Sequence, residues 1–257
     1  MTAPHPPATS APRDIYDEAG SAVYDRLVSG DTSELAELVS TVRAAVAGRR
    51  DAQVLELACG SGRITVPLVA AGFDVYALDL SPTMIELLRS RLTEQPSRPQ
   101  HPARLLVASM VGFEVPATFD AVLLGTASIS LLHHPSERRQ CFASVLSHLR
   151  AGGVFALTNV ELPASVASHT CTDLPDTGLR LVEDVDHGGR TRHVRIVPAD
   201  GGLGCTLGSN TALLDAAGLR AELHASGFTD VRLRELAVHD DGRRHQLITA
   251  RRGLDGP

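Results

Sequence analysis

The feature that most constrains the fold is a pair of short apolar runs separated by a glycine-rich turn and a helical stretch. The first run, Val54–Leu57, leads into Gly60–Gly62, and the second, Asp74–Leu78, ends on the carboxylate Asp79. Two parallel strands joined by a helix have this order, and glycines at the turn let the backbone approach a ligand closely. The sequence therefore predicts a β–loop–α–β nucleotide site within an α/β fold.

The same residues leave other interpretations of this turn open. A lone G-x-G turn also occurs in α/β proteins without a cofactor. The dinucleotide fingerprint needs a third glycine three residues after Gly62, where this chain has Thr65. A carboxylate at Glu56, inside the first strand, suits a cofactor with a charged amino-acid tail better than one with a pyrophosphate.

Composition limits the domain number and the function. A chain of 257 residues can form one sizeable α/β domain. It contains no apolar run approaching the ~20 residues that span a bilayer. The net charge is −6, lysine is absent, and no basic stripe is interleaved with aromatic residues. We therefore expect neither a nucleic-acid partner nor a membrane partner, and no lysine-based catalysis.

Cysteine and histidine spacing and the N-terminal composition indicate the cellular setting. The cysteines lack C-x-x-C spacing and the eleven histidines lack zinc-ligand spacing, so we expect reduced thiols, a cytoplasmic protein and no metal site. Met1–Pro12 is rich in Pro, Ala and Ser without an apolar core, so we interpret residues 1–13 as a flexible leader and not a signal peptide. The four cysteines are Cys59, Cys141, Cys171 and Cys205.

Hydrophobic periodicity predicts an alternating core between residues 51 and 162. Residues 14–50 precede it and read as two helices, the second opened by Asp31–Ser33. A turn is expected at 151–153. The predicted core strands are 53–57, 74–78, 104–108, 121–124 and 154–159, and the predicted core helices are 63–71, 82–92 and 135–149.

The pattern changes after the fifth core strand. Residues 163–207 are predicted to form an insertion containing an antiparallel hairpin around the turn 186–189. Residues 208–252 would complete the sheet with a helix at 210–226 and strands at 230–237 and 246–251. The insertion either covers the ligand site and shapes a substrate pocket or forms a dimerisation flap, so monomer and homodimer both stay open.

Two motifs resemble those of class I S-adenosylmethionine-dependent methyltransferases. They are E-x-A-C-G-S-G-R at 56–63 and D-L-S-P-x-M at 79–84. The resemblance covers about residues 14–252 and is specific up to Val160. It implies a Rossmann-like doubly wound sheet whose last strand is antiparallel, with the helices of residues 14–50 capping the cofactor site. It also implies S-adenosylmethionine as cofactor and S-adenosylhomocysteine as product.

The resemblance also assigns cofactor contacts by position. Glu56 would hold the methionyl ammonium, and Asp79 would accept both ribose hydroxyls. Ser109 stands where many members have an aspartate that binds the adenine amino group, which weakens that contact or transfers it to a backbone carbonyl. Tyr24 would cover the methionine carboxylate, although helix packing explains it equally well. The other expected cofactor contacts are Ala58, Gly60, Ser61, Gly62, Arg63, Leu80, Met84, Met110, Gly125 and Thr126.

Methyl transfer asks mainly for positioning of the acceptor, which can be worth roughly 7–11 kcal/mol. An amine acceptor must be unprotonated, so a nearby proton acceptor helps. The candidate catalytic residues at strand ends are His133, with its neighbour His134, and Glu161. Each also has a structural interpretation, the histidines as neighbours of a helix start and Glu161 as a solvated loop carboxylate.

The acceptor class also follows from resemblance. The overall plan looks like that of natural-product N-methyltransferases acting on small molecules. Amino-sugar N,N-dimethyltransferases commonly have a histidine in a Ser-Ile-Gly-His run, which residues 128–131 lack. The segments 55–63 and 125–132 more closely resemble daptide-type ribosomal peptide methyltransferases, thought to dimethylate a terminal amine. We therefore expect a small-molecule or peptide amine acceptor. A small-molecule O-methyltransferase, an amino-sugar N,N-dimethyltransferase and a cofactor-binding regulatory protein stay open as alternatives.

Overall fold

The larger of two β-sheets, here called the core sheet, has seven strands. The structure is a computed structural model that describes residues 13–17, 20–21, 23–25, 34–46, 49, 52–95, 102–201 and 206–254. The strand order is β4-β3-β2-β5-β6-β12-β11. β12 is antiparallel to both its neighbours and the other pairings are parallel, so the predicted doubly wound sheet with a reversed last strand is confirmed. The strands are β2 (Gln53–Leu57), β3 (Asp74–Asp79), β4 (Arg104–Val107), β5 (Phe119–Leu124), β6 (Leu149–Glu161), β11 (Thr229–Val238) and β12 (Arg244–Arg251).

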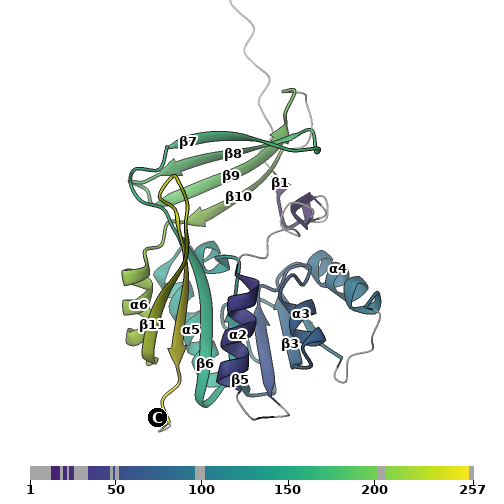
Figure 1. Ribbon diagram of the computed structural model, residues 1–257, viewed down its shortest axis with the longest axis vertical. Coiled ribbons are helices and arrows are strands. Elements are labelled where there is room, and N and C mark those ends of the chain that lie inside the picture. Colours follow the sequence, from purple (N-terminus) through teal and green to yellow (C-terminus); the bar gives the residue numbers. More distant parts are fainter. Residues whose placement is uncertain are drawn as a thin grey trace, which may run out of the picture.

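Helices cover both faces of the core sheet (Figure 1). On one face, Leu38 and Val42 of α2 are buried in a cluster with Ala121 and Ala156 of the sheet. On the other, Phe142 of α5 packs in a cluster with residues of α6. These apolar residues recur at helical spacing, so each helix buries one face. The first face carries α2 (Leu35–Ala45), α3 (Thr65–Ala70) and α4 (Pro82–Thr93), and the second carries α5 (Pro135–His148) and α6 (Ala216–Ala225).

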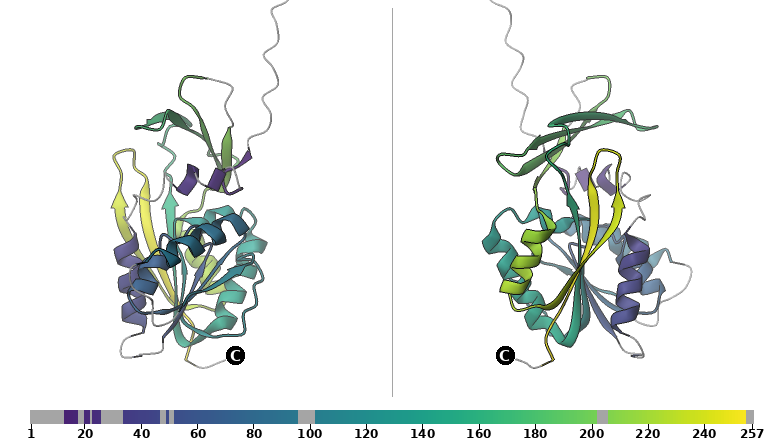
Figure 2. Two further views of the ribbon diagram at one scale, coloured as in Figure 1. Left: turned by 90° about the vertical axis from the view of Figure 1, so that its right-hand side faces the viewer. Right: turned by 60° about the vertical axis from the view of Figure 1, so that its left-hand side comes forward.

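A second sheet of five strands, here called the roof sheet, lies over the carboxyl ends of the core strands (Figures 1 and 2). Its strand order is β1-β10-β9-β8-β7, and the short β1 pairs with β10 in parallel. The N-terminal segment thus joins a sheet built mostly from residues more than 150 positions away. The strands are β1 (Arg13–Asp14), β7 (His169–Leu174), β8 (Leu179–Asp186), β9 (Thr191–Pro198) and β10 (Leu207–Ala212).

The helix predicted from Asn210 is wrong in its start. Leu207–Ala212 is β10, which pairs with β9 along its whole length, and α6 begins only at Ala216. Asp215 fixes that start, because its side chain accepts the Gly218 N–H at 2.7 Å. The predicted hairpin exists as β8 and β9, but it is extended on both sides by β7 and β10 into a larger antiparallel sheet.

The turn predicted at 151–153 lies inside β6, which begins at Leu149, as an irregularity of the strand. Gly152 has φ +74°, and the register with β5 shifts between Phe119 and Ala121. Gly152 N–H donates to the Arg252 carbonyl at 3.1 Å, and Arg252 N–H donates to the Gly153 carbonyl at 3.0 Å. This pairing continues the sheet through the two glycines. The other predicted core strands and helices are confirmed to within a few residues.

The N-terminal region differs from the first of the two predicted helices. Asp14 lies in β1, and helical turns occur only at 20–21 and 23–25 among the described residues before α2. The second predicted helix is confirmed as α2, which covers a face of the core sheet. Its predicted start at Asp31–Ser33 and the leader before Arg13 lie outside the described residues.

Candidate active site

A cavity of about 840 Å³ lies where the carboxyl ends of the core strands meet the roof sheet. The β–loop–α–β motif supplies one end of its lining, and β10 with the N-terminal segment supplies the other. Twelve of the sixteen predicted site residues line it: Tyr24, Glu56, Ala58, Gly60, Ser61, Arg63, Asp79, Leu80, Met84, Ser109, Met110 and Thr126.

The glycine-rich loop after β2 is open toward this cavity. Gly60 has φ +53°, and a Cβ placed on it would meet no atom within 4 Å. Gly62 differs, because a Cβ there would lie 2.2 Å from Leu88 of α4. Gly62 thus lets the loop pack closely against α4, while Gly60 leaves space beside the loop that a ligand can use.

Asp79 connects the loop to the end of β3. Its Oδ2 accepts the Gly60 N–H at 2.8 Å, and its Oδ1 accepts the Ser81 N–H at 2.8 Å. Burial raises the pKa of this carboxyl above its ordinary value, against the effect of these backbone donors. The neighbouring Leu80 is 72% exposed although it lines the cavity, so an apolar surface stands beside the carboxylate.

Glu56 is the most buried carboxylate of the cavity, with an exposed fraction of 2%. The Thr65 hydroxyl at the start of α3 donates a hydrogen bond to it. Burial raises the pKa of Glu56 to about 8, and the charge of Asp79 acts in the same direction. A cationic ligand group beside Glu56 would favour the ionised carboxylate.

A third carboxylate, Glu34, was not predicted from the sequence. It immediately precedes α2 and forms an ion pair with Arg63 of the glycine-rich loop. It also accepts the Thr126 N–H at 2.6 Å, at the end of β5. Thr126 has φ +55° and the next residue, Ala127, has φ +52°, which is a costly conformation for side chains with a Cβ. Glu34 therefore links the first loop to a strained turn at the cavity.

The N-terminal segment packs two tyrosines together and contacts the loop through Asp25. Tyr16 and Tyr24 pack edge to face with ring centroids 5.0 Å apart. Asp25 accepts hydrogen bonds from Ser61 and from Arg91 of α4, and Arg91 Nη1 donates to the Ser61 carbonyl at 3.1 Å. No spacing in the sequence predicts Asp25 or Arg91, because their contacts join positions 30 or more residues apart, and Tyr16 lies in a segment of irregular pattern.

Ser109 lines the cavity at the end of β4. Its hydroxyl accepts the Val111 N–H at 3.0 Å, so the side chain is bonded to its own turn. The Ser109 hydroxyl thus stabilises the turn after β4.

Four predicted site residues do not line the cavity. Gly62 faces α4, and Gly125 packs against Ile64. His133 is exposed, with its Nε2 3.1 Å from the Asn210 carbonyl oxygen. Glu161 accepts the Ala216 N–H and the Gln246 amide, each at 3.1 Å, and so joins β6 to α6 and β12. Neither predicted catalytic residue therefore faces the cavity.

The charges around the cavity are unbalanced. Asp14, Asp17 and Glu137 line it in addition to Glu56 and Asp79. Among the described lining residues, the one basic side chain is Arg63, which is already paired with Glu34. Leu131 of η1 (Ser128–Leu131) and Leu132 add an apolar wall.

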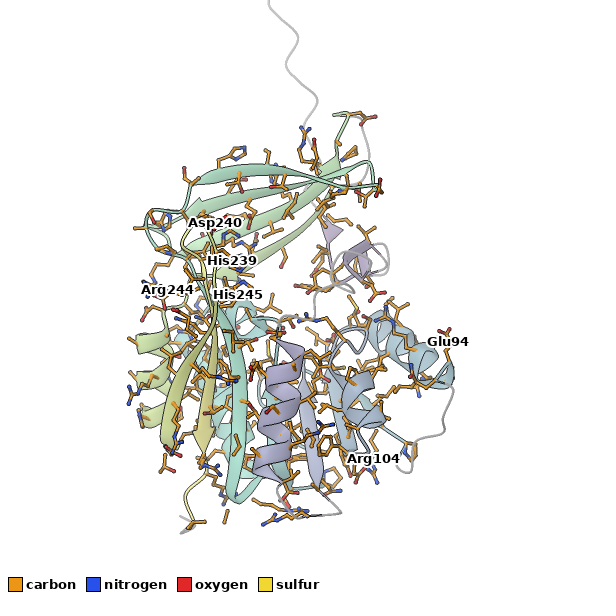
Figure 3. All side chains as sticks on the ribbon, in the orientation of Figure 1. Glu94, Arg104, His239, Asp240, Arg244 and His245 are labelled. Atoms are coloured by element: carbon orange, nitrogen blue, oxygen red, sulfur yellow. The ribbon has the colours of Figure 1, made fainter. Side chains whose placement is uncertain are left out.

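The β11–β12 hairpin supports the roof sheet from one side. Figure 3 shows its tip, with His239 and Arg244, reaching the roof strands. There Arg243 donates to both carboxylate oxygens of Glu183 in β8, at 3.0 and 2.9 Å. Arg192 of β9 pairs with the same carboxylate, so Glu183 joins the roof to the core sheet.

Two general features of the described residues bear on function. None of the helices among them is both long and apolar enough to cross a membrane. They also contain no group of three or more His, Cys, Asp or Glu side chains arranged to hold a metal ion.

Comparison with known sequences gives a domain match. Residues 54–153 match the family described as a methyltransferase domain. The uncharacterized methyltransferase Rv3342 of Mycobacterium tuberculosis is 33% identical over 151 residues, which are 58% of this chain and 54% of that protein. The chain spans about half the length of the curated relatives it matches.

Solved structures match over almost the whole chain. The methyltransferase CcbJ from Streptomyces caelestis has a TM-score of 0.78 over 93% of this chain and 98% of its own, at 18% identity, which shows a shared fold. The glycopeptide N-methyltransferase MtfA, complexed with S-adenosylmethionine, is 28% identical with a TM-score of 0.62, over 96% of this chain and 99% of its own.

Proposed function

Because the chain is a class I S-adenosylmethionine-dependent methyltransferase in domain and in fold, we propose that it methylates an amine of a natural-product or ribosomal-peptide intermediate. In its sharpest form, the reaction is N,N-dimethylation of a terminal amine. The observation that carries the choice of an amine is the excess of carboxylates around the cavity.

The cavity residues fit the cofactor. The open space at Gly60 admits a ligand against the loop backbone, and the exposed Leu80 offers an apolar surface for the adenine. We assign the ribose hydroxyls to Asp79 and the methionyl ammonium to Glu56. S-adenosylmethionine supplies a methyl group on a positively charged sulfur. Arg63 and Tyr24 are the proposed partners of the methionine carboxylate.

The carboxylate excess favours a cationic acceptor. Asp14, Asp17 and Glu137 lie on the cavity wall, and Arg63 is neutralised by Glu34. Carboxylates in a partly enclosed cleft concentrate cations and repel anions, so an ammonium group enters more readily than a carboxylate or phosphate. The apolar side chains Leu131 and Leu132 would contact the rest of the acceptor.

The reaction then depends on positioning and on loss of one proton from the acceptor. Holding the nitrogen in line with the methyl group can supply roughly 7–11 kcal/mol of the barrier reduction. We propose that the cavity carboxylates, through a water molecule or directly, receive the ammonium proton. His133 and Glu161 have no part in this proposal, because their side chains are bonded elsewhere.

The test is to incubate the enzyme and S-adenosylmethionine with peptides that carry a free terminal amine, and with copies whose amine is acetylated. We expect one or two added methyl groups on the free amine, located by fragment masses, and none on the acetylated copy. Methyl groups found on a hydroxyl oxygen of both peptides would overturn the amine assignment in favour of an O-methyltransferase. Amino sugars in the same assay separate a sugar acceptor from a peptide.

A charge variant tests the carrying observation directly. Glu137→Gln keeps an oxygen that can accept the His134 N–H, but removes the charge from the cavity wall. We expect a higher KM for the amine with unchanged S-adenosylmethionine affinity. Glu94→Gln is the matched control, because Glu94 is an exposed carboxylate at the end of α4, far from the roof sheet (Figure 3). Equal KM values for the amine in the wild type, Glu137→Gln and Glu94→Gln would contradict the selection of a cationic acceptor by the cavity carboxylates.

A further inference from the structure

Outside the cavity, the roof sheet brings a cysteine, a histidine and an aspartate together. His169 and Cys171 alternate along β7, so both side chains lie on one face of the sheet. Asp184 of β8 is directly opposite His169 in the strand register. Val182 is opposite Cys171, and Arg195 of β9 is opposite Val182, so Arg195 belongs to the same face.

This face is turned away from the cavity. The other face carries Ser209, which hydrogen-bonds Tyr16, and Glu183, which pairs with Arg243 of the β11–β12 hairpin. It also carries Leu207 and Ile196, buried in a cluster with Ile15. Because side chains alternate between faces, Cys171 must point outward, and it is exposed. β7 is also the edge strand of the described roof sheet, which leaves the thiol accessible.

The geometry of the three side chains is that of an activated nucleophile. Cys171 Sγ lies 3.3 Å from His169 Nε2, and His169 Nδ1 lies 2.6 Å from Asp184 Oδ1. A carboxylate oxygen only accepts, so Nδ1 must donate its proton to Asp184. Nε2 then carries the lone pair that faces the thiol. Arg195 Nη2, 2.6 Å from Asp184 Oδ2, holds the carboxylate in place.

Two arginines lie near the cluster, each paired with an aspartate. Arg180 interacts electrostatically with Cys171 and forms an ion pair with Asp173, and Arg195 forms one with Asp184. Cysteines that react readily are exposed and lie next to a base. The charged and titratable groups on this face of the described strands are His169, Cys171, Asp173, Arg180, Asp184, Asp186, His193 and Arg195.

The two other described cysteines provide an internal contrast. Cys59 and Cys141 are buried, and burial raises the pKa of both thiols, that of Cys141 to about 12. A thiol must be ionised to attack, so both should be inert in the folded protein. Cys205 lies outside the described residues.

We propose that Cys171 is a nucleophilic thiol that undergoes thiol–disulfide exchange with small disulfides on the outer face of the roof sheet, with His169 as its base. His169 Nε2 takes the thiol proton, and the Cys171 thiolate attacks one sulfur of the small disulfide. A new S–S bond forms as the original S–S bond breaks, and the other half leaves as a thiolate. The small disulfide is the oxidant, and no further reactant is needed.

The experiment follows mixed-disulfide formation with glutathione disulfide, in full-length protein carrying Cys205→Ser. Intact mass gives the rate, and peptide mapping locates the adduct. We expect the adduct on Cys171, and a rate near neutral pH roughly tenfold lower in His169→Gln. Asp184→Asn should also slow the reaction. His193→Gln is the matched control, because His193 lies on the same face but is bonded to Asn210, and its rate should be unchanged.

The pH profile separates a base from a structural role. At high pH the thiol ionises unaided, so the His169→Gln rate should approach that of the wild type. A deficit that persists at every pH would indicate a disturbed strand and overturn the proposal. An unchanged rate in His169→Gln, or adducts on Cys59 or Cys141, would overturn it equally. Cys171→Ser should abolish the adduct.

Discussion

The two ends of the cavity are built in different ways. At the cofactor end, a carboxylate and backbone N–H groups of one β–loop–α–β unit bond one another, as in Asp79, which accepts the Gly60 and Ser81 N–H groups. At the roof end, an ion pair joins Glu183 to Arg243, sixty residues away. The first end is a local turn set on parallel strands, and the second is a sheet fixed by charge pairs. This difference predicts that variants at the cofactor end will change the binding of S-adenosylmethionine, whereas variants at the roof end will change the binding of the acceptor.

The largest effect should come from Asp79→Ala. It removes the proposed ribose contact and the carboxylate that accepts the Gly60 and Ser81 N–H groups. Loss of charged hydrogen bonds of this kind should weaken S-adenosylmethionine binding roughly hundredfold or more. Isothermal titration calorimetry measures this, with Asp79→Asn as a smaller change of the same shape. Unchanged affinity in the alanine variant would refute the ribose assignment.

Glu56→Gln should have the second-largest effect and a distinctive pH dependence. The pKa of Glu56 is raised to about 8, so in the free protein the carboxyl is protonated near neutral pH. If it binds the methionyl ammonium, it must ionise on binding. Affinity in the wild type should then increase with pH up to about 8, by at most about tenfold per pH unit, and Glu56→Gln should remove this dependence. Calorimetry in buffers of different ionisation enthalpy would detect the released proton.

The same shift gives a stability prediction with the opposite sign. The pKa of Glu56 in the folded protein lies above the ordinary 4.5, so its contribution to stability is full below 4.5 and is lost as the pH rises toward about 8. Glu56→Gln should therefore unfold at a higher temperature than the wild type near pH 8, while binding cofactor less well. If Glu56→Gln unfolds at a lower temperature than the wild type and its cofactor affinity still depends on pH, the buried carboxyl of Glu56 is not the cause of these effects.

The distance along the sequence between contacting residues explains what the sequence could predict. The core strands, the glycine-rich loop and Asp79 follow from hydrophobic periodicity and turn residues, which act over short distances. The role of Glu34 needs the ends of β2, α2 and β5 to meet, and no spacing in the sequence encodes that meeting. The helix predicted from Asn210 starts too early, because pairing with β9 decides the conformation of Leu207–Ala212.

At the roof end, Arg243→Gln should affect the acceptor and leave the cofactor unchanged. Burial alone would raise the pKa of Glu183, but hydrogen bonds and charge from Arg243 and Arg192 lower it to about 2. Its contribution to stability is thus present above the ordinary 4.5 and is lost as the pH falls toward about 2. Arg243→Gln should reduce this stability by about 1–3 kcal/mol and raise the acceptor KM several-fold.

Urea unfolding at neutral and acidic pH tests the stability part, and initial rates test the KM. Arg244→Gln is the matched control, because Arg244 is the next residue of the hairpin but lies 3.9 Å from its partner Glu235 at an exposed position. A change in S-adenosylmethionine affinity equal to the change in acceptor KM would show that the two ends are not separate.

The smallest expected effect is at the boundary between the two ends. Arg91 of α4 joins the N-terminal segment to the glycine-rich loop, through its ion pair with Asp25 and its bonds to Ser61 at 3.0 and 3.1 Å. Because these groups are partly exposed, Arg91→Gln should cost no more than about 1 kcal/mol, seen as a few-fold faster release of S-adenosylmethionine in stopped-flow measurements. Arg89→Gln, which removes a surface pair on the same helix, should release the cofactor at the wild-type rate. If Arg91→Gln weakens S-adenosylmethionine binding as much as Asp79→Ala does, the N-terminal segment is part of the cofactor end, and the boundary between the two ends lies elsewhere.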